Sequence, residues 1–347
     1  MQDDSRQYEH GATFIGGFPK SGTSLLLSLL DSHPELLVIP EESFFFSRVM
    51  PSHNRATALL EHTYLANLKE ETVENEGWGV RHHGHFDFET FAREIKTRVT
   101  DTISDKEALL ELVVAFARAE KTPNRTRWVE KTPGNELYAH LIRKWFPGGL
   151  LLQVVRDPRD NFASYKKHRG KKGESISIES LCLRWAVSVE CVLRLEKKNA
   201  ARMVVYENLV RDPETIMRSL AEYMGITYNK TLIEPSIHGS AWSGNSMHNT
   251  QHRGISTSSV GVYGDRLTLE EIGMIQSYLK SYMIRFGYAF DEHVPEPSML
   301  QKFLFRAKLL KLIHWNYRHV WSSFMLPGFL PGVYRNSKKR LAKRTTF

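Results

Sequence analysis

A short apolar run, a turn of small residues and a leucine-rich run follow one another in Phe14-Ile-Gly-Gly-Phe-Pro-Lys-Ser-Gly-Thr-Ser-Leu-Leu-Leu-Ser-Leu-Leu30. The first run predicts a buried strand and the second a helix. In such a turn, backbone N–H groups and the unpaired donors at the helix N-terminus converge on one point. Lys20 adds a full positive charge there. We therefore expect this turn to bind a phosphate group.

The lysine of this turn stands before Gly22, whereas the lysine of nucleotide triphosphatase loops follows the last glycine. The order is therefore wrong for a Walker motif. A turn that binds nothing is the alternative, because short motifs often match by chance. A second, independent motif is needed to choose between these interpretations.

A second apolar run, Leu150-Leu-Leu-Gln-Val-Val155, ends at Arg156, and Ser164 follows eight residues later. Such an unbroken run is typical of a buried parallel strand. Arg156 then leaves the carboxyl end of the strand, where open α/β sheets bind ligands, and Ser164 lies about two turns into the next helix. An arginine fork with a hydroxyl suits a phosphate monoester. The alternative is a surface turn in which Asp157 or Asp160 caps the helix.

These motifs resemble those of sulfotransferases that use 3′-phosphoadenosine 5′-phosphosulfate (PAPS). Pro19-Lys-Ser-Gly-Thr-Ser24 resembles their 5′-phosphosulfate loop, and the pair Arg156 and Ser164 resembles the residues that grip the 3′-phosphate. Further blocks at 129–133, 204–210 and 253–261 look like those of bacterial and Golgi sulfotransferases that modify sugars or protein tyrosines. The resemblance covers residues 12 to 290.

The resemblance implies an α/β fold of the P-loop type, with three α/β/α layers around a central parallel sheet. Apolar runs alternate with helical stretches, which is the pattern of a parallel sheet with crossover helices. The strand-like runs lie at 12–17, 126–129, 150–155 and 202–206. We expect an N-terminal extension at 1–11, a main domain at 12–290 with a helical, acceptor-binding insertion at 44–125, and a basic helical C-terminal tail at 291–347.

The resemblance also implies how the donor is held. Lys20 would neutralise the oxygen left on the 5′-phosphate, while backbone amides and hydroxyls of the turn hold that phosphate. Beside Arg156 and Ser164, the predicted contacts to the donor are Ser21, Gly22, Thr23, Ser24, Tyr206, Arg253 and Ser256.

The acceptor is expected to be an alcohol or phenol, so a base must take its proton. The related enzymes carry a glutamate just past the first helix, where this chain offers Glu41 and Glu42. An ungapped count favours Glu41, and a shift of one residue selects Glu42. Lys131 would offset charge on the transferring group, with an ion pair to Glu130 as its alternative role.

The stretch Arg81-His-His-Gly-His85 suggests a metal site, but it lacks a distant ligand and the chemistry needs no metal. We therefore expect no metal. His83 or His85 could share the role of base. Phe44 to Phe46 and Trp78 are candidates to line the acceptor site, although aromatic side chains equally fill cores.

Positive charge gathers at the C-terminus, since residues 301–347 contain 11 Lys or Arg and no Asp or Glu. The other 300 residues hold 36 basic against 39 acidic side chains, so the net charge of +8 belongs to the tail. Residues 303–317 interleave apolar and basic side chains, a mixture that suits an anionic membrane surface. The alternative is an ordinary helix packed on the core. No specific nucleic acid is expected, because basic charge alone carries no sequence readout.

Cys182 and Cys191 are the only cysteines of the chain. They lie in a predicted helix at 178–197 and cannot bridge each other locally. Two cysteines in a chain of this size suit a reducing compartment. The N-terminus has no apolar signal core, and no run is long enough to span a bilayer. We expect a cytoplasmic protein with peripheral contact at the inner membrane surface.

Three functions remain to be weighed. The first is transfer of the sulfuryl group of PAPS to a hydroxyl of a glycan, glycolipid or secondary metabolite, with release of adenosine 3′,5′-bisphosphate. The second is a small-molecule kinase, for which Asp157 would be the acidic Mg²⁺ ligand. The third is a non-catalytic scaffold that binds membranes through the tail. The two phosphate motifs together favour the first, while the acceptor and the oligomeric state stay open.

Overall fold

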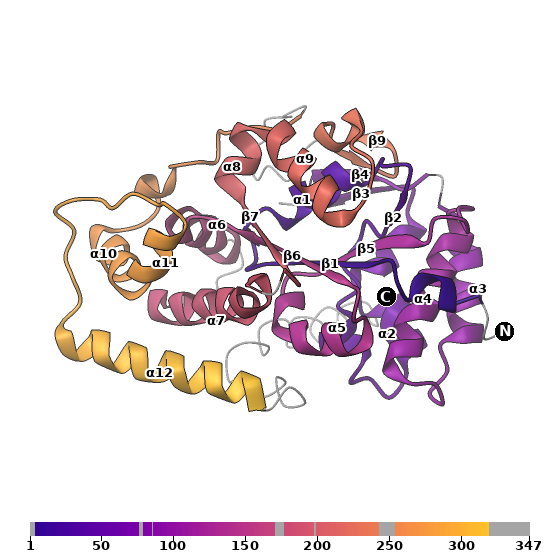
Figure 1. The fold of residues 1–347 in the computed structure, drawn as a ribbon, viewed down its shortest axis with the longest axis horizontal. Helices are drawn as coiled ribbons and strands as arrows, with labels where there is room; N and C mark the ends of the chain where they lie inside the picture. The colour runs from indigo at the N-terminus through magenta and orange to yellow at the C-terminus, as the bar shows by residue number, and fades with distance from the viewer. Residues whose placement is uncertain are drawn as a thin grey trace, which may run out of the picture.

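A computed structural model describes residues 4–75, 79–84, 86–170, 177–197, 199–242 and 254–318. Its centre is a five-stranded parallel sheet in the order β2-β5-β1-β6-β7, flanked by helices on both sides (Figure 1). This arrangement confirms the predicted three-layer α/β fold. The strands are β1 (Ala12–Gly16), β2 (Leu36–Val38), β5 (Arg127–Lys131), β6 (Leu150–Val155) and β7 (Arg202–Val205).

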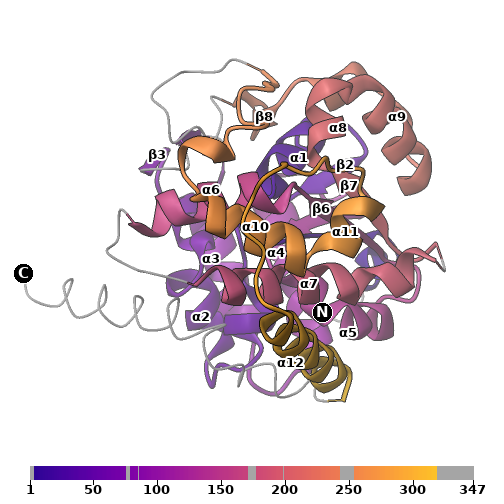
Figure 2. The same ribbon diagram turned by 90° about the vertical axis from the view of Figure 1, so that its left-hand side faces the viewer.

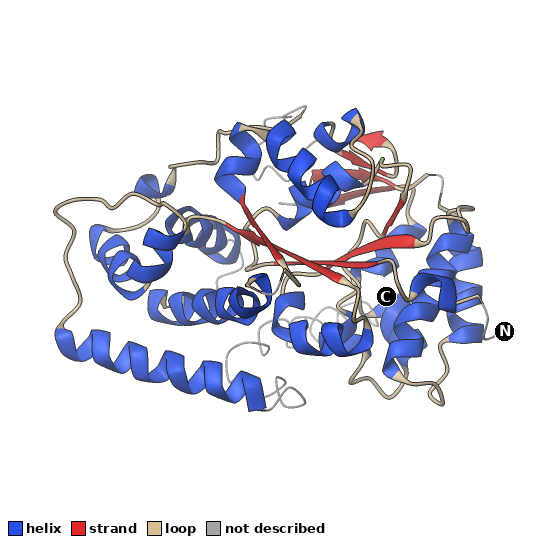
Figure 3. Cartoon of the chain, in the orientation of Figure 1, coloured by secondary structure: helices blue, strands red, loops and turns tan. Residues whose placement is uncertain are grey.

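Successive residues of the central strands point to opposite faces of the sheet. Phe14 and Leu151 join one core cluster with α4 and α5, whereas Ile15 and Leu152 join another with α1 and α9. Strands buried on both faces read as continuous apolar runs, which is why these strands are visible in the sequence. Figure 3 shows the strands as a central layer between two layers of helices. The helices named here are α1 (Thr23–Leu30), α4 (Asp105–Ala119), α5 (Ala139–Trp145) and α9 (Pro213–Met224).

The segment 44–125 is mainly helical, as expected, but it also contains an antiparallel hairpin that the sequence interpretation missed. Its helices are α2 (Arg55–Glu61), α3 (Phe88–Arg98) and α4, and the hairpin strands are β3 (Thr72–Asn75) and β4 (Gly79–His82). Most of this segment packs against one face of the sheet and shares its core.

The suggestion that Phe45 and Phe46 line the acceptor site is wrong. Both rings are buried, and Phe46 stacks on Tyr138 with 5.0 Å between ring centroids. They belong to the core beneath β1, where Phe46 also lies 5.9 Å from Phe14. Phe44 is half-buried, with the guanidinium of Arg48 3.9 Å from its ring centroid. Trp78 lies outside the described residues.

The second half of the chain completes the outer layers. The predicted helix at 178–197 is confirmed as α7 (Ile178–Glu196), which carries both cysteines. No helix within the described ranges is long and apolar enough to cross a membrane. The remaining helices are α6 (Pro158–Gly170), α8 (Tyr206–Arg211), α10 (Leu269–Tyr278), α11 (Lys280–Arg285) and α12 (Met299–Arg318).

Helix α12 contains the whole of the predicted apolar and basic segment at 303–317. It lies along α7 at the edge of the molecule (Figures 1 and 2). Phe305 stacks on Tyr278 of α10, with the ring centroids 4.2 Å apart and the planes 3° from parallel. One face of the segment is therefore packed on the core, as the alternative interpretation expected. Residues 319–347, with the basic run at 338–344, lie outside the described residues.

Candidate active site

The turn that is predicted to bind phosphate connects β1 to α1 at residues 17–22. Lys20 and Gly22 adopt left-handed backbone angles, with φ of 71° and 107°. The amide of Gly17 donates to Oε2 of Glu136 at 2.8 Å, which fixes the start of the turn. Burial raises the pKa of the Glu136 carboxyl. Oγ of Ser21 is buried, and no described residue accepts or donates a hydrogen bond to it, so the turn holds an unsatisfied hydroxyl.

Arg156 lies directly beside this turn, at the carboxyl end of β6. Its Nη1 donates to the Lys20 carbonyl at 3.1 Å, and its Nη2 donates to the Ser259 carbonyl at 2.5 Å. The guanidinium also lies over the Tyr206 ring, 4.8 Å from its centroid. Parallel neighbours β1 and β6 end at the same edge of the sheet, so residues 136 positions apart meet. The two phosphate motifs therefore face one site.

The first turn of α6 holds two separate loops of this site. The side-chain amide of Asn161 donates to the Pro19 carbonyl at 3.0 Å. The carboxylate of Asp160 accepts from the amides of Gly261 at 2.6 Å and Val262 at 2.8 Å. Burial raises the pKa of Asp160, and these two amides act against that rise. The turn at 17–22 and the loop at 254–262 are thus fixed relative to each other.

Asp157 has the helix-capping role that the sequence left open. It precedes α6, and its Oδ1 accepts from the backbone amide of Arg159 at 2.9 Å. Its Oδ2 also lies 2.7 Å from the Arg159 guanidinium, which in turn reaches Asp291 at 2.6 Å. Burial lowers the pKa of Arg159, but these carboxylates raise it by more, so the net effect is a rise. Asp157 is therefore part of a structural ion-pair network.

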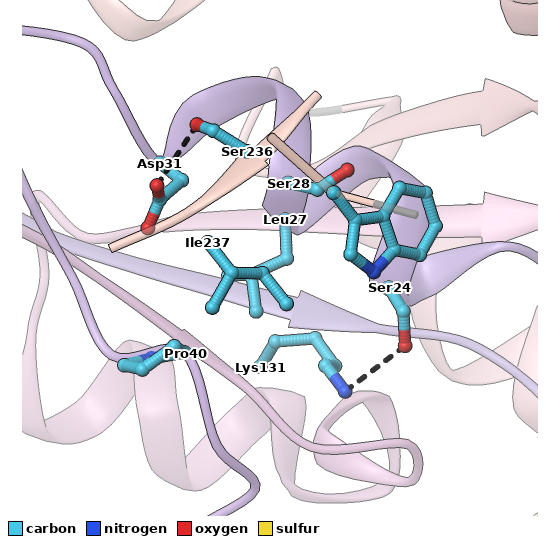
Figure 4. A pocket seen from close by; sticks show the side chains of 9 residues that line it. Ser24, Leu27, Ser28, Asp31, Pro40, Lys131, Ser236 and Ile237 are labelled. Atoms are coloured by element: carbon cyan, nitrogen blue, oxygen red, sulfur yellow. Dashed lines mark hydrogen bonds between the residues drawn. The ribbon is translucent and has the colours of Figure 1, made fainter. Parts of the chain in front are cut away.

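Lys131, at the end of β5, is buried and points into the site. Its Nζ lies 2.7 Å from Oε1 of Glu42 and 3.3 Å from Oγ of Ser24 (Figure 4 shows the latter contact). The alternative pairing with Glu130 is wrong, because successive strand residues point to opposite faces. Glu130 instead accepts hydrogen bonds from Ser43, Thr132 and Asn135, and burial raises its pKa.

The two adjacent glutamates diverge, as expected for neighbouring side chains. Glu42 faces Lys131, whereas Oε1 of the buried Glu41 lies 3.4 Å from Nε2 of His83. His83 is also fully buried, and its ring packs edge-on against His238 at 5.0 Å between centroids. Nδ1 of His238 lies 2.8 Å from Oε1 of Glu120. Glu41 is therefore part of a buried glutamate and histidine cluster.

A pocket opens next to Lys131 (Figure 4). Ser24, Ser28 and Asp31 of α1 line one side of it, since residues four and seven apart share a helix face. Its other lining residues are Leu27, Pro40, Ser236, Ile237 and Trp242. The pocket therefore combines apolar walls with a few polar groups beside a cation.

Asp31 and the residues that it holds were missed by the sequence interpretation. The Asp31 carboxylate accepts from Ser236 Oγ at 2.9 Å, and from the amides of His238 at 3.1 Å and Gly239 at 3.0 Å. These contacts attach the hairpin of β8 (Ser236–Ile237) and β9 (Ser240–Ala241) to the end of α1. No local pattern could have revealed them, because the partners are more than 200 positions apart.

The remaining predicted site residues lie at the start of α1, on α6, in the loop at 254–262 or outside the described residues. Thr23 is buried at the start of α1, as expected, and Ser24 follows it. Ser164 is half-buried on α6, and Ser256 bonds to Ser258 within the loop at 254–262. Arg253 and His85 lie outside the described residues. Among the residues that are described, no three His, Cys, Asp or Glu side chains form a group suited to a metal ion.

Substitution of Gly22 by alanine should weaken binding of adenosine 3′,5′-bisphosphate by at least about tenfold. An added Cβ would lie 2.4 Å from the Tyr206 ring, and the φ of 107° strains any other residue. Isothermal titration calorimetry measures this loss. Gly287→Ala is the matched control, because Gly287 also has a positive φ but has open space around it. An equal loss in both variants, or none in Gly22→Ala, would contradict the expected contact.

The sequence of this chain is similar to those of known sulfotransferases. The sequence profile described as Sulfotransferase family matches residues 12–230. Protein-tyrosine sulfotransferase A of Caenorhabditis elegans is 24% identical over 238 residues, which cover 67% of this chain and 54% of that protein. Protein-tyrosine sulfotransferase 1 of Danio rerio is 26% identical over 228 residues, covering 63% and 54%. The chain thus spans about half the length of these curated relatives.

Two solved structures share the fold. The sulfotransferase domain from the curacin biosynthetic pathway superimposes with a TM-score of 0.54 at 16% identity, covering 81% of this chain and 99% of that one. The sulfotransferase domain of the Synechococcus PCC 7002 olefin synthase gives a TM-score of 0.53 at 18% identity, covering 81% and 95%. At these identities the likeness shows the fold alone.

Proposed function

The chain belongs to the sulfotransferase family, and from this premise we propose that it is a sulfotransferase with PAPS as its donor and a hydroxyl group as its acceptor. The observation that carries the proposal is the contact between the two phosphate motifs, where Arg156 donates to the carbonyl of Lys20. One doubly phosphorylated adenosine can therefore be held between them.

The residues present fit such a donor. Oγ of Ser21 and Nε of Arg156 are buried without a hydrogen-bond partner in the described part of the chain, and both belong to the proposed phosphate contacts. A buried polar group without a partner is costly, so the two phosphates of the donor would each satisfy one of these groups. In the proposal Lys20 and residues 21–24 hold the 5′-phosphate. Arg156 and Ser164 hold the 3′-phosphate, and Tyr206, Arg253 and Ser256 enclose the nucleotide.

PAPS supplies a sulfuryl group on a good leaving group, and the enzyme contributes position and charge. Lys20 neutralises negative charge on the 5′-phosphate side of the breaking bond. Lys131 stabilises charge on the transferring group from the other side, since its Nζ reaches Ser24 at the start of α1. Family membership and the pairing of Asp157 with Arg159 both favour sulfuryl transfer over the kinase hypothesis.

Glu41 is the proposed base that takes the proton of the acceptor hydroxyl. Oε1 of Glu42 is engaged by Lys131 at 2.7 Å, so Glu42 is better suited to position that lysine. Glu41 lies beside His83 instead, and in the proposal His83 orients the Glu41 carboxylate and shares the proton. Both side chains are buried, which protects the proton transfer from bulk water.

The acceptor is proposed to be a hydroxyl of a glycan, glycolipid or secondary metabolite. The pocket beside Lys131 is small, and Leu27, Pro40 and Trp242 line it together with Ser28 and Asp31, so a hydroxyl that reached it would meet both apolar and polar groups. A screen of labelled sulfate transfer onto glycans, lipids and phenols identifies the class. We place the enzyme in a reducing, cytoplasmic compartment, which the thiols of Cys182 and Cys191 support.

Adenosine 3′,5′-bisphosphate should bind at least tenfold more tightly than ATP, a difference of about 1.4 kcal/mol. The reason is the arginine fork, which matches a 3′-phosphate that ATP lacks. Replacement of Arg156 by alanine should therefore remove the preference and leave the two affinities similar. Paired calorimetric titrations of the wild type and this variant measure both values.

The same titrations distinguish the alternatives. Equal binding of both nucleotides by the wild type would favour a kinase. Binding of neither would favour a scaffold without catalytic activity. Arg218→Ala is a suitable control, because Arg218 is exposed on α9 and pairs only with Glu214 and the ring of Tyr228 among the described residues. This control should keep the preference.

A further inference from the structure

Helix α12 has apolar side chains on two opposite faces. The inward face carries Phe305 and Leu309, which are 1% and 9% exposed. The outward face carries large apolar side chains that remain in contact with water, and Phe303 and Leu310 are 67% and 68% exposed. The other exposed apolar residues of the helix are Met299, Leu300 and Leu304.

The helical period accounts for the two faces. Each residue turns the helix by about 100°, so Phe303 and Leu310, seven positions apart, lie on the same side. Phe305 follows Phe303 by two positions and therefore points to the opposite side, toward Tyr278. Several large apolar side chains exposed on one side of a helix are unusual in a soluble monomer, and such groups often mark an interaction surface.

Basic side chains border the outward face. Arg306 and Lys311 are exposed, and neither forms an ion pair within the described residues. Two further lysines are paired, Lys308 with Glu179 at 2.6 Å and Lys302 with Glu296. The sequence holds no acidic residue after Glu296. The patch is therefore apolar in the middle and positive at its borders.

We propose that this outward face of α12 docks on an anionic lipid bilayer. Apolar side chains enter the boundary of the acyl chains, while Arg306 and Lys311 meet the lipid phosphates. The inward face stays packed on α7 and α10, so the helix lies flat on the membrane. The enzyme is then a peripheral protein, and its docking is independent of the proposed sulfuryl transfer.

The charges favour this occupant over three others. A second copy docked face to face would bring Arg306 and Lys311 against their own equivalents. Residues 319–347 carry 6 Lys or Arg and no acid, so they would meet the same repulsion on this face. A nucleic acid would match the charge but offers no apolar phase for Phe303 and Leu310.

Vesicle co-sedimentation of the full chain tests the proposal. The protein should bind vesicles of phosphatidylcholine mixed with phosphatidylglycerol, and bind pure phosphatidylcholine vesicles much less. The double variant Phe303→Ser and Leu310→Ser should partition at least about tenfold less, because two large apolar side chains no longer enter the bilayer. A variant with Arg306→Gln and Lys311→Gln should lose the preference for phosphatidylglycerol.

Ile284→Ser is the matched control, because Ile284 is an apolar residue on α11 that is 61% exposed. It should bind mixed vesicles like the wild type. Calorimetric binding of adenosine 3′,5′-bisphosphate should be unchanged in every variant, which shows that each is folded. If the wild type did not bind mixed vesicles, the proposal would be wrong. Another occupant, such as a second copy or residues 319–347, would then cover the face. An equal loss in Ile284→Ser would also contradict the proposal.

Discussion

Replacement of Glu41 by glutamine should lower kcat by about 10²- to 10⁴-fold, the usual contribution of a positioned general base. Glutamine keeps the size of the side chain but cannot accept the proton of the acceptor hydroxyl. Glu41 does not belong to the proposed donor contacts, so the affinity for adenosine 3′,5′-bisphosphate should stay unchanged. Single-turnover transfer of labelled sulfate to the acceptor found by screening, with calorimetry of the nucleotide, measures the two quantities.

Glu42 and His83 provide the comparisons for this experiment. A greater loss of kcat in Glu42→Gln than in Glu41→Gln would contradict the assignment of Glu41 as the base. His83→Asn should cost less than Glu41→Gln, because His83 acts on the reaction only through the carboxylate beside it. It should also move the acid limb of the pH profile of kcat, which a purely structural role of His83 would leave in place.

Replacement of Lys131 by methionine should affect both stability and turnover. The variant leaves Glu42 buried without its cation, which should lower the free energy of unfolding by about 3–5 kcal/mol. Turnover should fall by about 10²- to 10³-fold, because a charge directed at the transferring group is lost. Urea unfolding and kcat measure the two effects separately.

A second substitution separates fold from catalysis. Adding Glu42→Gln to Lys131→Met removes the buried charge, so most of the lost stability should return. Turnover should stay low, because the catalytic cation is still missing. Recovery of turnover together with stability would mean that Lys131 serves the fold alone. Lys131 would then have no catalytic role beside Ser24.

The sequence revealed those parts of the fold that depend on local patterns. β1 and β6 are buried on both faces, so their apolar runs stood out, and the turn at 17–22 joined a visible strand to a visible helix. The meeting of Lys20 with Arg156 also followed, since parallel strands end at one edge of the sheet. The roles of the individual site residues remain predictions.

Other features could not be predicted, because they depend on partners far apart in the chain. β2 has only three residues, which is too short for a periodic pattern. The pairing of Lys131 with Glu42 rather than Glu130 depends on which strand face each residue takes. Asp31 holds residues 236–239 through the Ser236 hydroxyl and two backbone amides, and any residue except proline can supply such an amide.

Helix α12 has one face packed on the core and another face that is exposed. Its composition left open a core helix or a surface for lipids. The structure packs Phe305 inward and leaves Phe303 exposed, so core packing is confirmed for one face only. Composition could not separate these roles, because two opposite apolar stripes cancel the one-sided pattern by which amphipathic helices are recognised.

The first turn of α6 has a consequence for how such enzymes diversify. Asp160 and Asn161 fasten the two loops that are proposed to face the nucleotide to one helix, through three hydrogen bonds that involve no described residue of the segment at 44–125. That segment meets the site at the end of β5, where the amide of Phe44 donates to Thr132 at 3.1 Å, and at Glu41, which lies 3.4 Å from His83. The proposed donor contacts are thus held together by α6. In evolution or in designed chimeric enzymes, the segment at 44–125 can therefore be exchanged while the proposed donor contacts are kept.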